Sequence, residues 1–315
     1  MEYIFGADVG GSSTKLGVFD REGKLIAERT VPTVTSGGGE RIIPDIARAV
    51  KSLSGELEPG AKILGMGMAV PGPVEAGGMV NGCVNLGWGR KDAAGEMAVL
   101  TDFPVFLLND ANAAALGEVW QGAARNCGGG AFMVTLGTGV GGAFIFGEQV
   151  VNGANGAGGE IGHMTVNPRE IEQCTCGRRG CLEQYVSTRG MVRTAKEQMG
   201  LHPESTLLSC DELSGKIIFE QALAGDEAAI KTVRLTADIL GQALACAAAI
   251  CDPEVFIIGG GLSGGGDYYL EQIVESYRRS VMYPCRETKF VIASLGHQAG
   301  MYGAARFAMG FLKGV

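Results

Sequence analysis

Two stretches of this sequence, one in each half, match each other without a gap. They are FGADVGGSSTKLGVF at residues 5–19 and FMVTLGTGVGGAFIF at residues 132–146. Each stretch is typical of a strand, a polar glycine turn and a returning strand. Two hairpins of one type predict a duplicated fold. The competing interpretation is chance, because a chain with 52 glycines offers many similar hairpins.

The hydrophobic periodicity of the rest of the chain predicts alternating strands and helices. Further strands are expected at Lys62–Val70, Pro104–Leu108 and Glu254–Ile258, and helices at Ala111–Gln121, Asp226–Ile250 and Ala299–Leu312. The helix at Asp226–Ile250 is apolar on more than one face, which indicates a central buried helix. With 315 residues, 46% of them hydrophobic, the chain is long enough for two α/β domains or one bilobed unit.

The charge and composition of the chain argue against a nucleic-acid partner and against a membrane partner. The formal net charge is −8 without a run of Lys or Arg, which argues against a nucleic-acid partner. The fully apolar stretch Ala243–Cys251 is too short to cross a bilayer, and the N-terminal residues resemble no signal peptide. Six of the nine cysteines are scattered singly, as is typical of a reducing compartment. We therefore expect a cytoplasmic protein without a membrane partner.

Three glycine-rich loops follow apolar strands, at Asp8–Lys15, Leu136–Gly142 and Ile257–Gly266. Glycine lets backbone N–H groups approach an anion without a Cβ in the way. The spacing matches neither a P-loop nor a dinucleotide fingerprint. Three such loops together favour a nucleotide held between two lobes, with Asp8 as a ligand of Mg²⁺. The alternative is that each loop is an ordinary hairpin turn and that Asp8 only stabilises one of them.

Asn109 and Asp110 stand where an apolar strand becomes a helix. Both residue types favour the N-terminus of a helix, so one interpretation is a structural cap. The other makes Asp110 a general base, because phosphoryl transfer to an alcohol needs a carboxylate to accept the hydroxyl proton. The two interpretations are compatible.

A cluster of metal-ligating side chains has the spacing H-x10-C-x-C-x4-C. It consists of His163, Cys174, Cys176 and Cys181. Three thiolates and one imidazole suit a structural zinc ion with tetrahedral geometry. The alternative is a set of free thiols beside a core histidine, and a disulfide is disfavoured by the reducing context.

Two glutamates flank this cluster. Glu160 precedes the histidine by three residues, and Glu183 follows the last cysteine by two. A zinc clip would hold both carboxylates in a region with little regular structure. Because carboxylates accept hydrogen bonds from sugar hydroxyls, we expect the metal to organise a sugar pocket without taking part in the chemistry.

Several motifs in this order resemble those of the ROK family of sugar kinases, repressors and related proteins. They are DVGGSST, VPGPV, LNDANAAALGE, LGTGVGG, EIGH, CTCGRRGCLE and AGMYGAA. The resemblance implies a duplicated, actin-like ATPase fold of the ribonuclease H-like type, with two lobes around a cleft. It places residues 1–120 and 299–315 in a small lobe and residues 121–298 in a large lobe with the zinc loop. It further implies ATP, Mg²⁺, structural Zn²⁺ and a homodimer.

The resemblance also assigns roles to single residues. Asp110 corresponds to the catalytic base and Asp8 to the magnesium ligand, and His163 serves both zinc and sugar. The sugar-contacting positions are Asn85, Asn109, Asp110, Glu160, His163 and Glu183. The nucleotide-contacting positions are Asp8, Gly10, Gly11, Ser12, Thr138, Gly139, Gly260 and Gly261.

Within the family, the pattern is similar to that of bacterial glucokinases with this cysteine cluster. The expected function is ATP-dependent phosphorylation of glucose to glucose 6-phosphate, a glycolytic step. Kinases for N-acetylmannosamine, N-acetylglucosamine, allose or fructose share these motifs, as do non-catalytic sugar-sensing members. Repressor members carry an N-terminal helix-turn-helix extension, for which the sequence before the first strand leaves no room.

Overall fold

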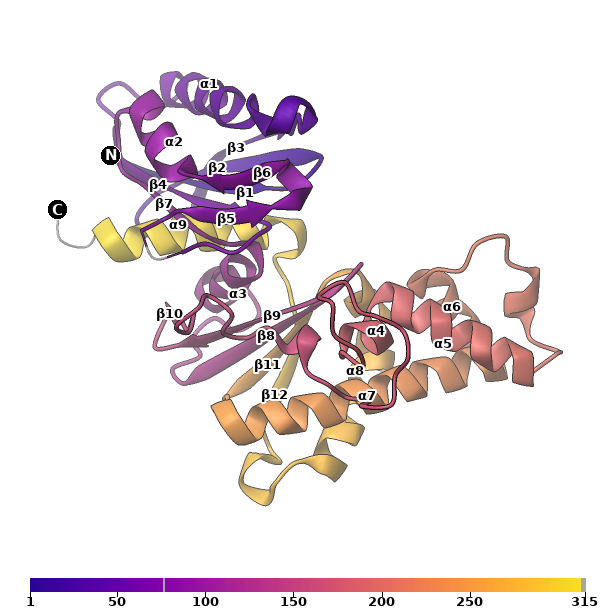
Figure 1. Ribbon diagram of the computed structural model, residues 1–315. Helices are drawn as coiled ribbons and strands as arrows, with labels where there is room; N and C mark the ends of the chain where they lie inside the picture. The colour runs from indigo at the N-terminus through magenta and orange to yellow at the C-terminus, as the bar shows by residue number, and fades with distance from the viewer. Residues whose placement is uncertain (76, 313–315) are drawn as a thin grey trace. The chain divides into compact units, whose positions relative to one another are not determined.

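The computed structural model describes residues 1–75 and 77–312 (Figure 1). The chain forms two compact units, and each is described by itself. The first unit contains Met1–Asn126, Ile145–Gly158 and the residues from Ser294 onward. The second unit contains Cys127–Phe144 and Gly159–Ala293.

Three segments that we expected in the second lobe belong to the first unit: 121–126, 145–158 and 294–298. The segment 145–158 is tied there by an ion pair between Glu148 and Arg306. The last segment begins at Ser294, whose backbone N–H donates to the buried carboxylate of Glu118 at 3.1 Å. Each contact joins segments far apart in the sequence, so local periodicity could not reveal it.

The first unit is built on a five-stranded sheet with the order β3-β2-β1-β4-β7. Its strands are β1 (Glu2–Val9), β2 (Ser13–Phe19), β3 (Leu25–Pro32), β4 (Lys62–Val70) and β7 (Val105–Asn109). The β1–β2 and β2–β3 pairs are antiparallel, whereas β4 is parallel to both β1 and β7. A separate hairpin is formed by β5 (Val80–Cys83) and β6 (Trp88–Lys91).

Helices cover both faces of this sheet. They are α1 (Ile42–Gly55), α2 (Ala93–Thr101), α3 (Asp110–Gln121) and α9 (Ala299–Leu312). Successive side chains of a strand point to opposite faces. Tyr3 and Phe5 of β1 accordingly pack in the core with α1 and α2, whereas Ile4 packs in a cluster with α9. The expected strand and helix boundaries in this unit agree with the structure to within a few residues.

Helix α9 approaches the sheet so closely that backbone touches backbone. A Cβ on Gly6 of β1 would lie 2.0 Å from the carbonyl oxygen of Met301, and a Cβ on Gly67 of β4 would lie 1.8 Å from that of Ala304. Real Cβ atoms do not come this near to a backbone oxygen. Part of the high glycine content is therefore explained by the packing of this helix.

The crossing of α3 and α9 gives a stability prediction. A Cβ on Gly303 would lie 1.6 Å from the carbonyl oxygen of Ala113, so Gly303→Ala must push the two helices apart. We expect a loss of about 3 kcal/mol or more in the free energy of unfolding. Gly310 of the same helix has open space around it, so Gly310→Ala is the matched control and should stabilise by up to about 1 kcal/mol. Urea unfolding followed by circular dichroism measures both, and a Gly303→Ala protein as stable as the wild type would contradict this packing.

A second sheet repeats the same strand order. Its strands are β8 (Gly130–Leu136), β9 (Val140–Phe146), β10 (Gln149–Val150), β11 (Val255–Gly259) and β12 (Lys289–Ile292), in the order β10-β9-β8-β11-β12. The last two residues of β9 and all of β10 belong to the segment 145–158, which is part of the first unit, and the other strands belong to the second unit. As in the first sheet, the last three strands of this order pair in parallel. The ungapped alignment places residues 13–19 on 140–146, the full extents of β2 and β9. The predicted duplication is therefore confirmed.

One long helix, α7 (Glu227–Cys251), forms the centre of the second unit. It packs with α4 (Glu183–Val186), α5 (Thr188–Leu201), α6 (Gly215–Leu223) and α8 (Gly266–Ser280). Among the described residues it is the one helix long and apolar enough to span a membrane, but most of its apolar residues lie in the core, as the sequence predicted. Short 3₁₀ segments occur in both units, at Ser36–Gly39, Val84–Leu86, Ile161–His163, Thr206–Ser209, Gly261–Gly265, Tyr283–Cys285 and Gly296–Gln298.

Candidate active site

The first glycine turn brings a carboxylate and a helix together. Asp8 lies near the end of β1, and the turn closes with a hydrogen bond from the Gly10 N–H to the Ser13 carbonyl at 3.0 Å. Gly300 of α9 lies against the Asp8 side chain, because a Cβ there would be 2.6 Å from Asp8 Cγ. Gly11 lies beside the backbone of Asn85, which would be 3.5 Å from its Cβ. Five of the predicted site residues of the first unit therefore lie at one turn: Asp8, Gly10, Gly11, Ser12 and Asn85.

Asp8 has an unusual electrostatic environment. Burial raises the pKa of its carboxyl to about 6; the negative charge of Asp110 contributes to the rise and Lys15 opposes it. Lys15 donates to the carbonyl oxygen of His297 at 2.9 Å and forms no ion pair with Asp8. The site therefore holds two carboxylates near each other with weak compensation, an arrangement that favours a bound cation.

This electrostatic strain predicts a gain in stability for Asp8→Asn. The pKa of Asp8 is higher in the folded chain than its ordinary value of 3.8, so the folded state loses stability as the pH rises from about 4 to about 6. Without divalent cations, Asp8→Asn should raise the melting temperature at pH 7.5, and the gain should vanish near pH 4. Thermal unfolding with a chelator present, from pH 4 to 8, measures this difference. If Asp8→Asn and the wild type had the same melting temperature at pH 7.5, ionised Asp8 would not destabilise the folded chain.

Asp110 begins helix α3, and Asn109 caps it. The Asn109 Oδ1 atom accepts from the N–H groups of Ala111 and Asn112 at 2.9 and 3.3 Å. The Asn109 amide group donates to Asp110 Oδ1 at 3.0 Å and to the Gly72 carbonyl at 3.3 Å. The structural interpretation of Asn109 as a cap is therefore confirmed, with Asp110 as the first residue of the helix.

Only one oxygen of the Asp110 carboxylate, Oδ1, accepts hydrogen bonds from other described residues. Oδ1 accepts from the Ala111 N–H at 2.8 Å as well as from Asn109, whereas Oδ2 accepts from no other residue in the described part of the chain. Burial raises the pKa of Asp110, and the donors at the helix N-terminus oppose the rise. A fixed carboxylate with a raised pKa and a free oxygen is suited to accept a proton.

Two neighbours of Asp110 were not predicted from the sequence. Cys83 is buried, and the negative charge of Asp110 adds to burial in raising the pKa of its thiol. Asn112, buried two residues further along α3, donates to the Asn152 side chain at 2.9 Å, and its own oxygen has no partner in the described residues. The second asparagine of the motif NDAN, which is Asn112, was the sequence feature that could have indicated this residue.

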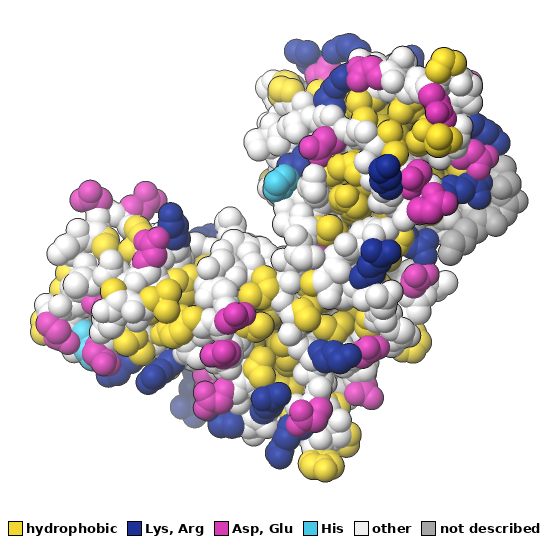
Figure 2. Space-filling model, turned by 180° about the vertical axis from the view of Figure 1, so that it is seen from behind, with side chains coloured by type: hydrophobic (Ala, Val, Ile, Leu, Met, Phe, Trp, Pro, Cys, Tyr) yellow, Lys and Arg dark blue, Asp and Glu magenta, His cyan; other side chains and the backbone are white. Residues whose placement is uncertain are grey.

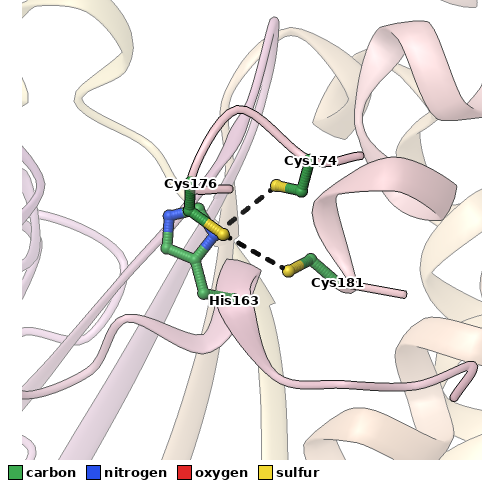
Figure 3. Close-up of side chains that lie close together, drawn as sticks. All are labelled: His163, Cys174, Cys176 and Cys181. Carbon is green, nitrogen blue, oxygen red and sulfur yellow. Dashed lines mark hydrogen bonds between the residues drawn. The ribbon is translucent and has the colours of Figure 1, made fainter. Parts of the chain in front are cut away.

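In the second unit, the four predicted zinc ligands converge on one point (Figure 3). Their ligand atoms all lie within 4.8 Å of one another. Cys176 Sγ is 3.6 Å from Cys181 Sγ, and Cys174 Sγ is 3.9 Å from His163 Nδ1. Ligands at zinc–sulfur distances of about 2.3 Å in tetrahedral geometry are separated by about 3.8 Å. The donor set and its spacing thus fit zinc, with Nδ1 as the histidine ligand.

The local sequence explains how the ligands come so near. Gly177 and Gly180 both have positive φ angles, of 84° and 75°. A Cβ on Gly180 would also lie 1.8 Å from the carbonyl oxygen of Asn167. The sulfur–sulfur distance of 3.6 Å is far from a disulfide bond of about 2.05 Å, and all three thiols are free.

The second and third glycine loops lie next to each other. Gly260 has a φ of 82°, and a Cβ there would be 2.4 Å from the carbonyl oxygen of Leu136, the last residue of β8. Gly261 then begins a 3₁₀ turn, and Thr138 is exposed in the β8–β9 turn. Two of the three predicted nucleotide loops are therefore adjacent within this unit.

The two glutamates differ from each other in environment. Glu160 is exposed immediately before the 3₁₀ turn that carries His163. Glu183 is half-buried at the start of α4 rather than in a loop, and its Oε2 accepts from the Val140 N–H at 3.0 Å. Glu183 is therefore already bound to a glycine turn, which the sequence did not indicate. The cleft expected between the lobes, and every sugar contact, remain predictions.

Comparison with known proteins identifies the family. Residues 4–310 match the family model described as ROK family. The chain belongs to the ROK family. ROK relatives include a glucokinase from Halalkalibacterium halodurans, which is 38% identical over 311 residues that cover 96% of this chain and 93% of the relative. A glucokinase from Streptomyces coelicolor is 35% identical over 323 residues, 98% of either protein.

Solved ROK structures agree with the fold. The ROK hexokinase from Thermus thermophilus has a TM-score of 0.85 and 32% sequence identity, covering 99% of this chain and 100% of that one. A ROK family glucokinase from Streptomyces griseus in complex with glucose and AMPPNP has a TM-score of 0.78 and 34% identity, covering 98% and 99%. The actin-like ATPase fold implied by the sequence motifs is thus confirmed.

Proposed function

We propose that this ROK protein phosphorylates glucose at its 6-hydroxyl with ATP as the donor. Relatives that match nearly the whole chain include glucokinases, and a structural neighbour holds glucose and AMPPNP. The observation that carries the proposal is Asp110, whose carboxylate is fixed at the start of α3 with one oxygen left to accept a proton.

In the proposed reaction, Asp110 acts as the general base. The sugar hydroxyl oxygen attacks the terminal phosphorus of ATP, the bond from that phosphorus to the ADP oxygen breaks, and the hydroxyl proton passes to Asp110 Oδ2. The hydrogen bonds from Ala111 and Asn109 to Oδ1 keep the carboxylate oriented during this transfer. The raised pKa brings Asp110 closer to the working pH, which favours proton acceptance.

The nucleotide is proposed to bind on the three glycine turns. Backbone N–H groups at Gly10–Ser12, Thr138–Gly139 and Gly260–Gly261 would face its phosphates. Asp8 would hold Mg²⁺, a proposal supported by its burial and by the nearby negative charge of Asp110, both of which raise its pKa. Bound magnesium neutralises phosphate charge during transfer.

The sugar is proposed to contact Asn85, Asn109, Asp110, Glu160, His163 and Glu183. Zinc bound by His163, Cys174, Cys176 and Cys181 would order the loop between His163 and Glu183. With Nδ1 directed toward the cysteines, the Nε2 of His163 is left to contact a sugar hydroxyl. The role of this zinc would be structural, because four protein ligands would leave no coordination position for water.

Three further expectations belong to this proposal. They are a homodimer, a cytoplasmic location and the absence of a nucleic-acid partner. The net charge of −8 supports the last, as does the mixing of acidic and basic side chains on the face drawn in Figure 2.

The proposed function is tested by a coupled assay over a panel of sugars. Glucose, mannose, fructose, allose, N-acetylglucosamine and N-acetylmannosamine would each be offered with ATP, and glucose also with polyphosphate. We expect the highest kcat/KM for glucose with ATP, with glucose 6-phosphate as the product. A preference for an N-acetylhexosamine would reassign the substrate. Sugar binding without ATP consumption would support a sugar-sensing role instead.

A further inference from the structure

The β8–β9 turn at Gly137–Gly139 is held by two contacts from outside the hairpin. The Thr188 N–H donates to the Gly137 carbonyl at 2.8 Å, and the Val140 N–H donates to Glu183 Oε2 at 3.0 Å. The Glu183 carboxylate also covers the turn, because a Cβ on Gly139 would lie only 2.4 Å from Oε2. The position of this turn therefore depends on where the Glu183 carboxylate lies.

The other oxygen of Glu183 is held by the cysteine loop. Thr175 stands between two of the candidate zinc ligands, Cys174 and Cys176, and its hydroxyl donates to Glu183 Oε1 at 3.2 Å. Cys174 Sγ is itself 3.8 Å from the same oxygen. One carboxylate thus joins the cysteine loop to the glycine turn, with one oxygen for each.

We infer that Glu183 positions the β8–β9 turn for the nucleotide and that Thr175 makes this position depend on the order of the cysteine loop. The inference rests on the proposed function, in which Thr138 and Gly139 face the phosphates. It assigns to Thr175 a role in nucleotide affinity, and it predicts that loop and nucleotide are coupled without direct contact. With respect to the nucleotide, Glu183 and Thr175 are both positioning residues.

The carboxylate has the capacity and the space that this role requires. A carboxylate offers about four acceptor sites, so its bonds to Val140 and Thr175 leave sites for a sugar hydroxyl. A cavity of about 200 Å³ lies beside it, lined in part by Thr175, Glu183 and Arg189. Without the Thr175 hydroxyl, the carboxylate is free to turn toward the Arg189 charge, and the Val140 N–H loses its acceptor.

The test compares three variants of the full-length, zinc-loaded protein. Thr175→Val removes the hydroxyl at nearly constant volume, and Thr175→Ser retains it. Thr165→Val is the matched control, because the Thr165 hydroxyl accepts from Arg178 at 2.9 Å and makes no contact with Glu183. Zinc content is measured for each protein, followed by the Kd for ADP by calorimetry and the amide exchange rate of Val140 by NMR.

We expect Thr175→Val to keep its zinc, to weaken ADP binding about fivefold and to speed exchange at Val140. Thr175→Ser and Thr165→Val should remain within about twofold of the wild type. If Thr175→Val loses zinc, Glu183→Gln replaces it, with the same expected changes in ADP binding and exchange. Unchanged Val140 exchange and ADP affinity in a zinc-loaded Thr175→Val protein would overturn the inference and leave the proposed function standing. A wild-type protein that binds no nucleotide would overturn both.

Discussion

Replacing Asp110 with asparagine is expected to lower kcat by about 10²- to 10⁴-fold. Asparagine has the same shape, and its oxygen can still accept from the Ala111 N–H that now holds Asp110 at 2.8 Å. The amide cannot take up the sugar proton, so the loss should fall on turnover. The Kd values for glucose and ADP should change by less than about threefold, because the geometry of the site is retained.

The matched control is Asp92→Asn. Asp92 is also an aspartate at a helix N-terminus, where its carboxylate accepts from the Gly95 N–H at 2.9 Å, but it has no role in the proposed site. Its kcat should equal that of the wild type. Because burial raises the pKa of Asp110, Asp110→Asn should also unfold at a higher temperature than the wild type at neutral pH. An Asp110→Asn enzyme with wild-type kcat would remove Asp110 from the role of base.

Removing zinc is expected to weaken glucose binding by more than about 100-fold, because the loop between His163 and Cys181 loses the ion that orders it. Cys176→Ala is the preferred variant. This cysteine is exposed, so its replacement removes a metal ligand without leaving a cavity in the core. Glu160 and Glu183 flank the loop, and both should become poorly positioned for the sugar. Calorimetry with glucose, together with metal analysis, measures the effect.

Cys246→Ala provides the control, since Cys246 is an exposed thiol on α7 away from the metal cluster. It should retain one zinc ion and wild-type glucose affinity. Metal analysis of the wild type should find one zinc ion for each chain. Unchanged glucose affinity in fully zinc-free protein would show that the metal does not organise the sugar pocket.

Local patterns in the sequence predicted much of the fold. The ungapped hairpin alignment placed β2 and β9 in the same register, because glycine turns and strand alternation are properties of neighbouring residues. The zinc cluster was predicted for the same reason, since its ligands come from one short segment and one nearby histidine. Its glycines also have the positive φ angles that such turns require.

Contacts between segments far apart in the sequence could not be predicted from local sequence patterns. Nothing local indicates that Gly303 touches the backbone of Ala113, or that burial and the charge of Asp110 raise the pKa of Asp8. The bond from Thr175 to Glu183 was missed because it depends on the fold of the cysteine loop. The segment 145–158 was assigned to the wrong unit because its ion pair to Arg306 spans more than 150 residues.

The most direct test of the central claim is a crystal structure with glucose and a non-hydrolysable ATP analogue bound together. The account predicts Asp110 Oδ2 within about 3 Å of the glucose 6-hydroxyl, with the terminal phosphate on the opposite side of that hydroxyl. Glucose held with its 6-hydroxyl out of reach of Asp110, or with another side chain in that place, would contradict it.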